Sequence, residues 1–176
     1  MIDRRTLLEA LVGLLLAPAA LARAQPSPAK APMDASRERL LVESPFVYVS
    51  PIRSNGEESR CHGEVWFGWI DGSVVVITAA KTWKARSLAR GLERARIWVG
   101  DYGRVKRIVG SNEAFRAGPS FFARAAREHD SDVLDRLLEI YDNKYPAEIK
   151  NWRGPMRAGF QNRTRVLIRY VPEART

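Results

Sequence analysis

The sequence predicts an α+β fold in which about six mainly antiparallel strands close into a small barrel flanked by about three helices. Three observations predict it. Short stretches rich in β-branched and aromatic residues follow one another, separated by the turn dipeptides Asn55-Gly56 and Asp71-Gly72. Other stretches repeat apolar residues at helical spacing. Closure into a barrel is the natural arrangement for such strands, because it removes exposed strand edges.

The first three predicted strands form a meander joined by two short turns. Phe46 to Arg53 alternates between two faces, and Arg60 to Ile70 does the same with Val65, Phe67 and Trp69 on one face. Ser73 to Thr78 holds four consecutive apolar residues, 74–77. A strand that is apolar on both faces is predicted to lie centrally in its sheet.

The pattern changes to a helical period over Thr82 to Leu92, where Thr82 is the expected N-cap. Two further strands are predicted, Arg96 to Gly100 and Val105 to Val109. A short helix is then expected over Pro119 to Glu128, with inward side chains at Phe121, Phe122, Ala125 and Ala126.

The strongest helical pattern in the chain is Ser131 to Asn143, which Ser131 is expected to cap. Its apolar stripe consists of Val133, Leu134, Leu137, Leu138 and Tyr141. A last strand is predicted over Thr164 to Val171, where apolar and basic residues alternate.

Composition restricts the kinds of site that the chain can build. The 176 residues carry a net charge of +9, which indicates an anionic partner without identifying it. The single cysteine, Cys61, excludes an internal disulfide and a zinc cluster of several thiolates. Two histidines, His62 and His129, leave little for a histidine-based metal site, so no metal is expected.

Residues 1–24 have the features of an export signal. Arg4-Arg5 precedes an apolar run that is too short to span a membrane comfortably, and Ala22-Arg23-Ala24 has the small-x-small form of a cleavage site. Arg-Arg-Thr-Leu-Leu resembles the twin-arginine consensus, although the general route stays open. We expect a periplasmic or secreted protein cleaved near Ala24, a linker and extension over 25–44, and one domain over 45–172 without a transmembrane segment.

The end of the central strand is the best candidate for a binding site. Thr78 ends that strand, and Thr82 and Lys84 begin the helix that follows. Hydroxyl groups and an ammonium group beside the first turn of a helix suit a phosphate or a carboxylate. Six basic residues lie between Lys81 and Arg96, and the alternative is that several of them form only the solvated face of this helix.

These residues resemble the split barrel of the pyridoxamine-phosphate oxidase and deazaflavin-reductase superfamily. There a strand-end Thr is followed by Ser-Arg-Lys and a helix, and Thr78, Thr82, Trp83 and Lys84 occupy these places. Arg60 matches a strand arginine that often reaches the flavin phosphate. The Asn-Pro after the family's helix is absent. The helix over 135–145, which ends in Lys-Tyr, and the last strand resemble an uncharacterised branch of the superfamily.

The resemblance implies a six-stranded, mainly antiparallel split β-barrel with about three flanking helices. It also implies that the chain binds FMN or a deazaflavin at a homodimer interface, as a small oxidoreductase of unknown substrate. Arg60, Thr78, Thr82 and Lys84 would hold the phosphate, and Trp66 could stack on a planar ring. The alternative is a non-enzymatic binding protein for another anionic ligand or partner, including an anionic membrane or cell-wall surface.

Other candidates are weaker. His62 and Glu64 share a strand face and could serve acid–base chemistry, but such residues also form ordinary polar pairs. No catalytic residue can therefore be named. A second basic cluster mixes with aromatic residues between Ile149 and Pro172, yet no nucleic-acid-binding motif accompanies it. We expect no nucleic-acid partner, and the cluster could complete an anion site with Lys84.

Overall fold

The computed structural model describes residues 35–103 and 113–174, and its centre is one antiparallel sheet in the order β2-β1-β5-β6-β7-β4-β3. The strands are β1 (Val47–Pro51), β2 (Gly63–Val65), β3 (Gly68–Ile70), β4 (Ser73–Ala79), β5 (Arg94–Val99), β6 (Ser120–Glu128) and β7 (Arg165–Pro172). The helices in these ranges are α1 (Ala35–Glu43), α2 (Trp83–Ala89), α3 (Ser131–Lys144) and α4 (Ile149–Gln161), with a short 3-10 helix, η1 (Ala114–Ala117). The predicted α+β class is confirmed, with seven strands and four α-helices instead of six and three.

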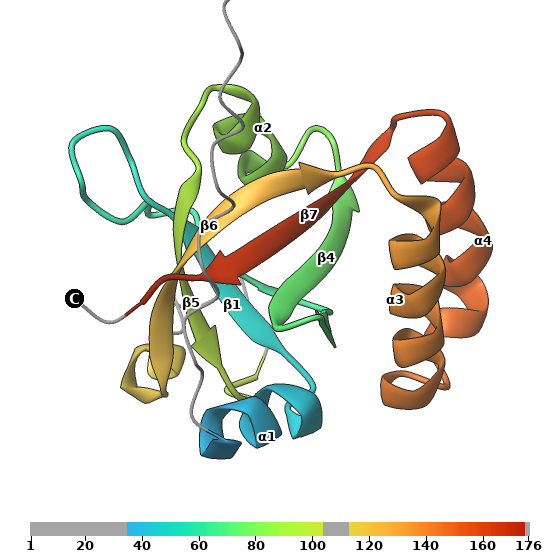
Figure 1. The fold of residues 1–176 in the computed structure, drawn as a ribbon, viewed down its shortest axis with the longest axis horizontal. Helices are drawn as coiled ribbons and strands as arrows, with labels where there is room; N and C mark the ends of the chain where they lie inside the picture. Colours follow the sequence, from blue (N-terminus) through green and yellow to red (C-terminus); the bar gives the residue numbers. More distant parts are fainter. Residues whose placement is uncertain (1–34, 104–112, 175–176) are drawn as a thin grey trace, which may run out of the picture.

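The sheet curls into a barrel (Figure 1). The chain passes from one edge of the sheet to the other at a two-residue interruption between β2 and β3, which we call the barrel break. The strands β2 and β3 lie at opposite ends of the strand order, yet only Trp66 and Phe67 separate them. The prediction of one strand from Arg60 to Ile70 is therefore wrong. The cause is curvature, because the first half pairs with β1 and the second half pairs with β4. Phe67 turns fully into the barrel interior at the break.

The predicted turns and the central strand are confirmed. Asp71 and Gly72 both have positive φ, at 50° and 69°, as a two-residue hairpin turn requires. β4 lies between β3 and β7 and is apolar on both faces, as expected. Val74 and Val76 pack inside the barrel, whereas Val75 and Ile77 pack against the layer of α3 and α4. β4 therefore joins the two main cores.

The segment from Ser120 to Glu128 is the strand β6, so the predicted helix over 119–128 is wrong. Ala123 and Ala125 are buried, and they alternate with the exposed side chains of Phe122 and Arg124. Alanine and arginine favour helices locally, but pairing with β5 on one side and β7 on the other overrides that preference. The buried residues of this segment are therefore two positions apart, as in a strand, and Phe122 faces outward.

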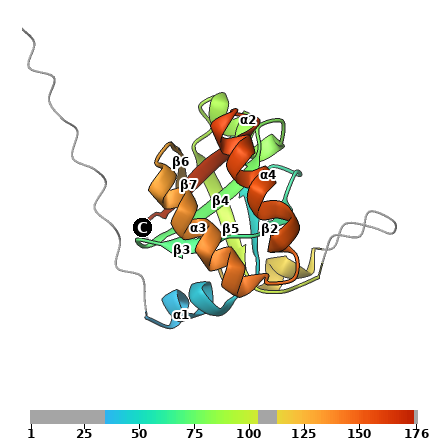
Figure 2. The same cartoon turned by 90° about the vertical axis from the view of Figure 1, so that its right-hand side faces the viewer.

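Two antiparallel helices, α3 and α4, cover one face of the barrel (Figure 2). α3 is confirmed, and its five predicted stripe residues are all buried. Its N-cap is Asp130, one residue before the predicted Ser131, because the Asp130 carboxylate accepts the backbone N–H of Asp132 at 2.8 Å. α4 was not predicted, since Gly154, Pro155 and Gly159 interrupt its helical pattern.

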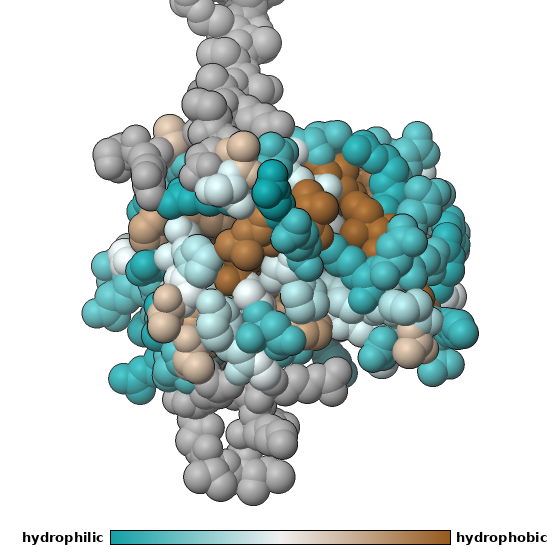
Figure 3. All heavy atoms as spheres, turned by 90° about the horizontal axis from the view of Figure 1, so that it is seen from below, coloured by the Kyte–Doolittle hydropathy of each residue, from teal (hydrophilic) through white to brown (hydrophobic). Residues whose placement is uncertain are grey.

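The other two helices lie at opposite ends of the barrel, α2 at the end where β4 finishes and α1 at the other (Figure 1). The face seen from the α1 end is mostly hydrophilic, with hydrophobic patches separated by polar side chains (Figure 3). No helix within 35–103 or 113–174 is long and apolar enough to cross a membrane. The predicted export signal (1–24), the first half of the extension (25–34) and the predicted strand Val105 to Val109 lie outside the described residues.

Candidate anion-binding site

The two threonines of the predicted site meet where β4 leads into α2. The hydroxyl oxygens of Thr78 and Thr82 lie 3.2 Å apart and share a hydrogen bond. Thr82 is the N-cap of α2, as predicted, and its hydroxyl accepts the backbone N–H of Ala85 at 3.5 Å. Thr78 is buried, at 8% exposure. The end of β4 and the start of α2 thus bring two hydroxyl groups together at one end of the barrel.

Lys84 extends from the first turn of α2 toward the start of β2. Its ammonium nitrogen would lie 3.6 Å from a Cβ placed on Gly63, so the lysine passes close to the backbone there. The side chain is half-buried and makes no hydrogen bond or ion pair with the residues of 35–103 and 113–174. Burial lowers the pKa of Lys84, and the nearby Cys61 thiol acts in the opposite direction. A desolvated cation without a counter-charge is a place where an anion would be stabilised.

The structure places the other two predicted residues differently. Arg60 is exposed and has no hydrogen-bond or ion-pair partner among the described residues. Trp66 lies at the barrel break, where its indole stacks on the Tyr145 ring at 4.3 Å and 10°. Trp66 also borders a shallow pocket of about 280 Å³ with Trp152, Met156 and Arg165. The structure therefore brings the hydroxyl groups of Thr78 and Thr82 together and places the Lys84 ammonium beside Cys61 and Gly63. Arg60 directly precedes Cys61 in the chain, and Trp66 lies at the barrel break.

The Lys-Tyr pair that ends α3 ties this helix to the segment after α1. The Lys144 ammonium donates to the carbonyl oxygens of Leu41 (3.3 Å) and Ser44 (2.9 Å), and the Tyr145 hydroxyl donates to that of Pro45. Burial lowers the pKa of Lys144 to about 8. Both side chains therefore serve a structural connection between the N-terminal helix and the barrel.

His62 and Glu64, at the start of β2, contact different residues. The His62 Nε2 atom lies 3.4 Å from a Glu113 carboxylate oxygen, and the Glu64 carboxylate accepts the Tyr48 hydroxyl at 3.4 Å. Cys61 is exposed. Within the part of the chain that the structure describes, no three His, Cys, Asp or Glu side chains are grouped as metal ligands would be. No acid–base role follows from this arrangement.

Three arginines of the C-terminal basic cluster form ion pairs with acidic side chains. Arg157 pairs with Asp135 at 2.6 Å and Arg169 with Glu128 at 2.8 Å, while Arg153 pairs with Asp142. Arg165 lies opposite Ala79 in the sheet, and the backbone N–H of Ala80 donates to the Thr164 carbonyl at 2.9 Å. The start of β7 therefore lies beside the loop that carries Thr82, and a shared anion site with Lys84 stays a prediction.

The sequence did not predict that Gly63 lies beside Lys84. The two residues are 21 positions apart and share no motif, and they approach each other only because the start of β2 passes α2. The backbone there lets the lysine approach without a side chain in the way.

No family model matches the sequence, and no curated protein matches it. Solved structures are similar in fold. A conserved hypothetical protein from Mycobacterium tuberculosis is 20% identical with a TM-score of 0.54, over 82% of this chain and 84% of that one. The heme storage protein HutZ from Vibrio cholerae is 15% identical with a TM-score of 0.52, over 80% and 89%. An FAD-binding protein from Mesorhizobium loti is 12% identical with a TM-score of 0.50, over 80% and 91%.

The fold is a split barrel. At these identities the likeness extends to the fold alone, because unrelated functions recur on one architecture. The curled antiparallel sheet with flanking helices agrees with the fold that the sequence resemblance implied.

Proposed function

We propose that this protein binds a flavin-type cofactor, FMN or a deazaflavin, and holds its phosphate with Thr78, Thr82 and Lys84. The observation that carries the proposal is the half-buried Lys84 ammonium, which has no counter-charge among the described residues. Two hydroxyl groups 3.2 Å apart stand at the start of the same helix. Hydroxyl and ammonium donors are the groups that hold phosphate oxygens in proteins.

Two further observations agree with a bound ligand near the start of α2. The indole N–H of Trp83, the first residue of this helix, is buried without a hydrogen-bond partner in the described part of the chain. The order Thr78, Thr82, Lys84 also matches the phosphate-binding pattern of the superfamily that the sequence resembles. Among the structural neighbours, the protein from Mesorhizobium loti is described as FAD-binding.

Arg60 and Trp66 have supporting roles in the proposal. Arg60 is exposed and free of described partners, so its side chain can turn toward a phosphate. One face of the Trp66 indole packs on Tyr145, and Trp66 also borders the shallow pocket beside β7. A planar ring bound there could stack on Trp66 at a centroid distance close to the 4.3 Å between Trp66 and Tyr145.

The bound cofactor would supply hydride chemistry, and the protein would bind and orient it. Thr78, Thr82 and Lys84 would fix the phosphate end. The flanking strands would set the direction of the ring. The proposal thus extends to a small oxidoreductase whose substrate is not assigned.

Export and dimerisation belong to the same proposal. Residues 1–24 would direct the chain to the periplasm or beyond, and two copies would complete the cofactor site. N-terminal sequencing of the protein recovered from the periplasm tests the cleavage near Ala24, and light scattering tests the dimer. An uncleaved cytoplasmic chain or a monomer would contradict these two parts.

The binding proposal is tested with the full chain expressed in the cytoplasm and purified without added cofactor. We expect either a coloured preparation with a flavin-type absorbance, or quenching of FMN or deazaflavin fluorescence when the protein is titrated into it. A colourless protein that leaves both fluorescence signals unchanged would overturn the proposal. Thermal stabilisation by inorganic phosphate without any flavin binding would instead identify a non-redox binding protein for an anion.

A further inference from the structure

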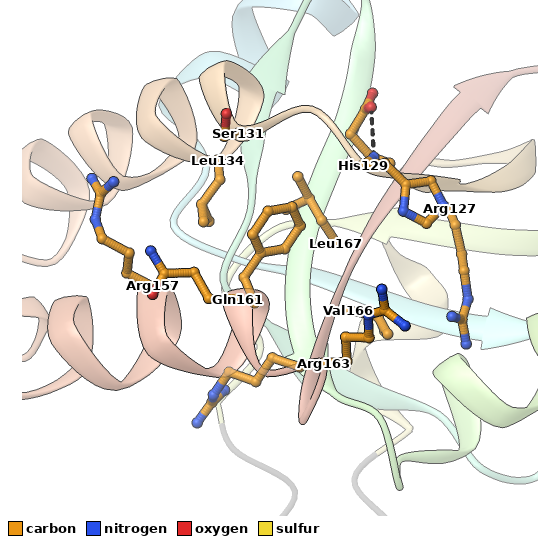
Figure 4. Close-up of a pocket in the computed structure, with 12 residues that line it drawn as sticks. Arg127, His129, Ser131, Leu134, Arg157, Gln161, Arg163, Val166 and Leu167 are labelled. Atoms are coloured by element: carbon orange, nitrogen blue, oxygen red, sulfur yellow. Dashed lines mark hydrogen bonds between the residues drawn. The ribbon is translucent and has the colours of Figure 1, made fainter.

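A second cleft, separate from the threonine–lysine site, opens between the two helices and the sheet. It has a volume of about 530 Å³ and lies where β6 leads into α3 and where α4 leads into β7 (Figure 4). This volume lies within the range of small-molecule pockets. Its basic lining side chains are Arg127, His129, Arg157, Arg163 and Arg165.

The basic side chains surround an apolar floor. Leu134 from α3, Phe160 from α4 and Leu167 from β7 line the cleft between them. Figure 4 shows Leu134 and Leu167 in the middle of the cleft, with Arg127 and Arg157 on opposite sides of it. The cleft therefore combines a hydrophobic base with a cationic rim.

Three of the arginines are not neutralised. Arg157 pairs with Asp135 at 2.6 Å, but Arg127, Arg163 and Arg165 have no acidic partner in 35–103 or 113–174. The guanidinium of Arg165 lies 5.5 Å from the centroid of the Trp152 ring, which lines the neighbouring pocket, so Arg165 stands at the border between the two pockets. Unpaired guanidinium groups around one cleft produce a positive potential that attracts anions.

The one acidic residue in the lining is already engaged. Glu128 accepts the Arg169 side chain at 2.8 Å through one oxygen, and the backbone N–H groups of His129 (2.9 Å) and Asp130 (3.2 Å) through the other. Burial alone would raise the pKa of Glu128, but these hydrogen bonds together lower it. Glu128 is thus held as a carboxylate that Arg169 balances, and the excess positive charge of the cleft remains.

Arg163 also has an unfavourable backbone conformation. Its φ is +62°, just after the end of α4, at a position where glycine or asparagine is the usual residue. A bulky residue in the left-handed region carries a steric cost that its surroundings must offset. Because this strained arginine also lines the cleft, its conformation favours a role for its side chain there.

We propose that this cleft binds a small organic anion, with a phosphate or carboxylate group held by Arg127, Arg163 and Arg165 and an apolar body against Leu134 and Phe160. The site uses none of Thr78, Thr82 or Lys84, and it shares Arg165 alone with the pocket beside Trp66. Its ligand is proposed in addition to the cofactor.

The test is calorimetric titration of the full chain with phenyl phosphate, benzoate and inorganic phosphate. We expect phenyl phosphate or benzoate to bind, and inorganic phosphate to bind more weakly because it lacks an apolar body. Preference between phenyl phosphate and benzoate identifies the anionic group. No measurable binding of either aromatic anion, or equal binding of inorganic phosphate, would overturn the proposal.

Arg163→Gly is the decisive variant. It removes the guanidinium and relieves the left-handed strain, so the melting temperature should stay the same or rise while affinity falls roughly tenfold. Arg127→Gln should weaken binding by a similar factor. Arg39→Gln, an exposed change of equal charge on α1, should leave it unchanged. Equal affinity in Arg163→Gly and the parent, or a loss caused by Lys84→Met instead, would place the anion elsewhere.

Discussion

Replacing Lys84 by methionine should stabilise the cofactor-free protein. The ammonium of Lys84 is half-buried and has no counter-charge among the described residues, so its burial is a cost in the absence of a ligand. Methionine has a similar length and suits a half-buried position. Because solvent still screens part of the charge, we expect a gain of about 0.5–1 kcal/mol in the free energy of unfolding. This corresponds to a melting temperature higher by roughly 1–4 °C.

The same substitution should weaken cofactor binding. A charge-assisted hydrogen bond contributes about 1.5–3 kcal/mol, so losing the Lys84 ammonium should raise the dissociation constant of FMN roughly 10- to 150-fold. Lys81→Met is the matched control, because Lys81 is exposed and lies three residues earlier. Urea unfolding and fluorescence titration measure the two effects. A Lys84→Met variant that is less stable than the parent and binds FMN equally well would refute the reasoning.

The stabilisation by Lys84→Met should also depend on pH. Burial lowers the pKa of Lys84 in the folded protein below its value of 10.5 in the unfolded chain. The unfolded state therefore binds the proton more strongly, and the stability of the parent rises with pH between these two pKa values. The advantage of Lys84→Met should be full below the folded pKa and should shrink as the pH approaches 10.5. An advantage that stays constant over this interval would contradict the assignment of the cost to the charge.

Three further substitutions test the packing of the helices and the barrel. Gly68→Ala should lower the free energy of unfolding by about 1–3 kcal/mol, because the new Cβ would lie 2.7 Å from Leu137 Cδ1. Gly154→Ala, whose Cβ meets nothing within 4 Å in helix α4, should instead raise it by about 0.5–1 kcal/mol, and the opposite ranking in urea unfolding would be inconsistent with the α3–β3 contact. Tyr145→Phe should cost about 1–3 kcal/mol, since it leaves the Pro45 carbonyl and the Phe67 N–H without their partner, and an unchanged melting curve would exclude that role.

Local signals allowed much of the fold to be predicted from the sequence. The turn at Asp71-Gly72, the doubly apolar β4 and the stripe of α3 each depend on neighbouring residues. The prediction failed where distant pairing overrides local preference. The alanine- and arginine-rich β6 becomes a strand only because β5 and β7 flank it. The helix α4 contains Gly154 and Pro155, two residues that disfavour helices, so its spacing of apolar residues did not predict a helix.

The candidate site follows the same rule. Thr78, Thr82 and Lys84 span seven residues, so their places on one strand-to-helix connection could be inferred from the sequence. The approach of Gly63 to Lys84 depends on the curvature of the sheet, which a single sequence does not encode locally. The arginine-lined cleft could not be predicted either, because Arg127 and Arg165 line the same cleft only through the pairing of β6 with β7.

The comparison of FMN with riboflavin tests the central claim most directly, because the two differ only in the phosphate. If Thr78, Thr82 and Lys84 hold that phosphate, FMN should bind at least about tenfold more tightly than riboflavin. Lys84→Met should remove most of this difference, and Lys81→Met should keep it. Equal affinities for FMN and riboflavin, or a preference for FMN that survives Lys84→Met, would contradict the account.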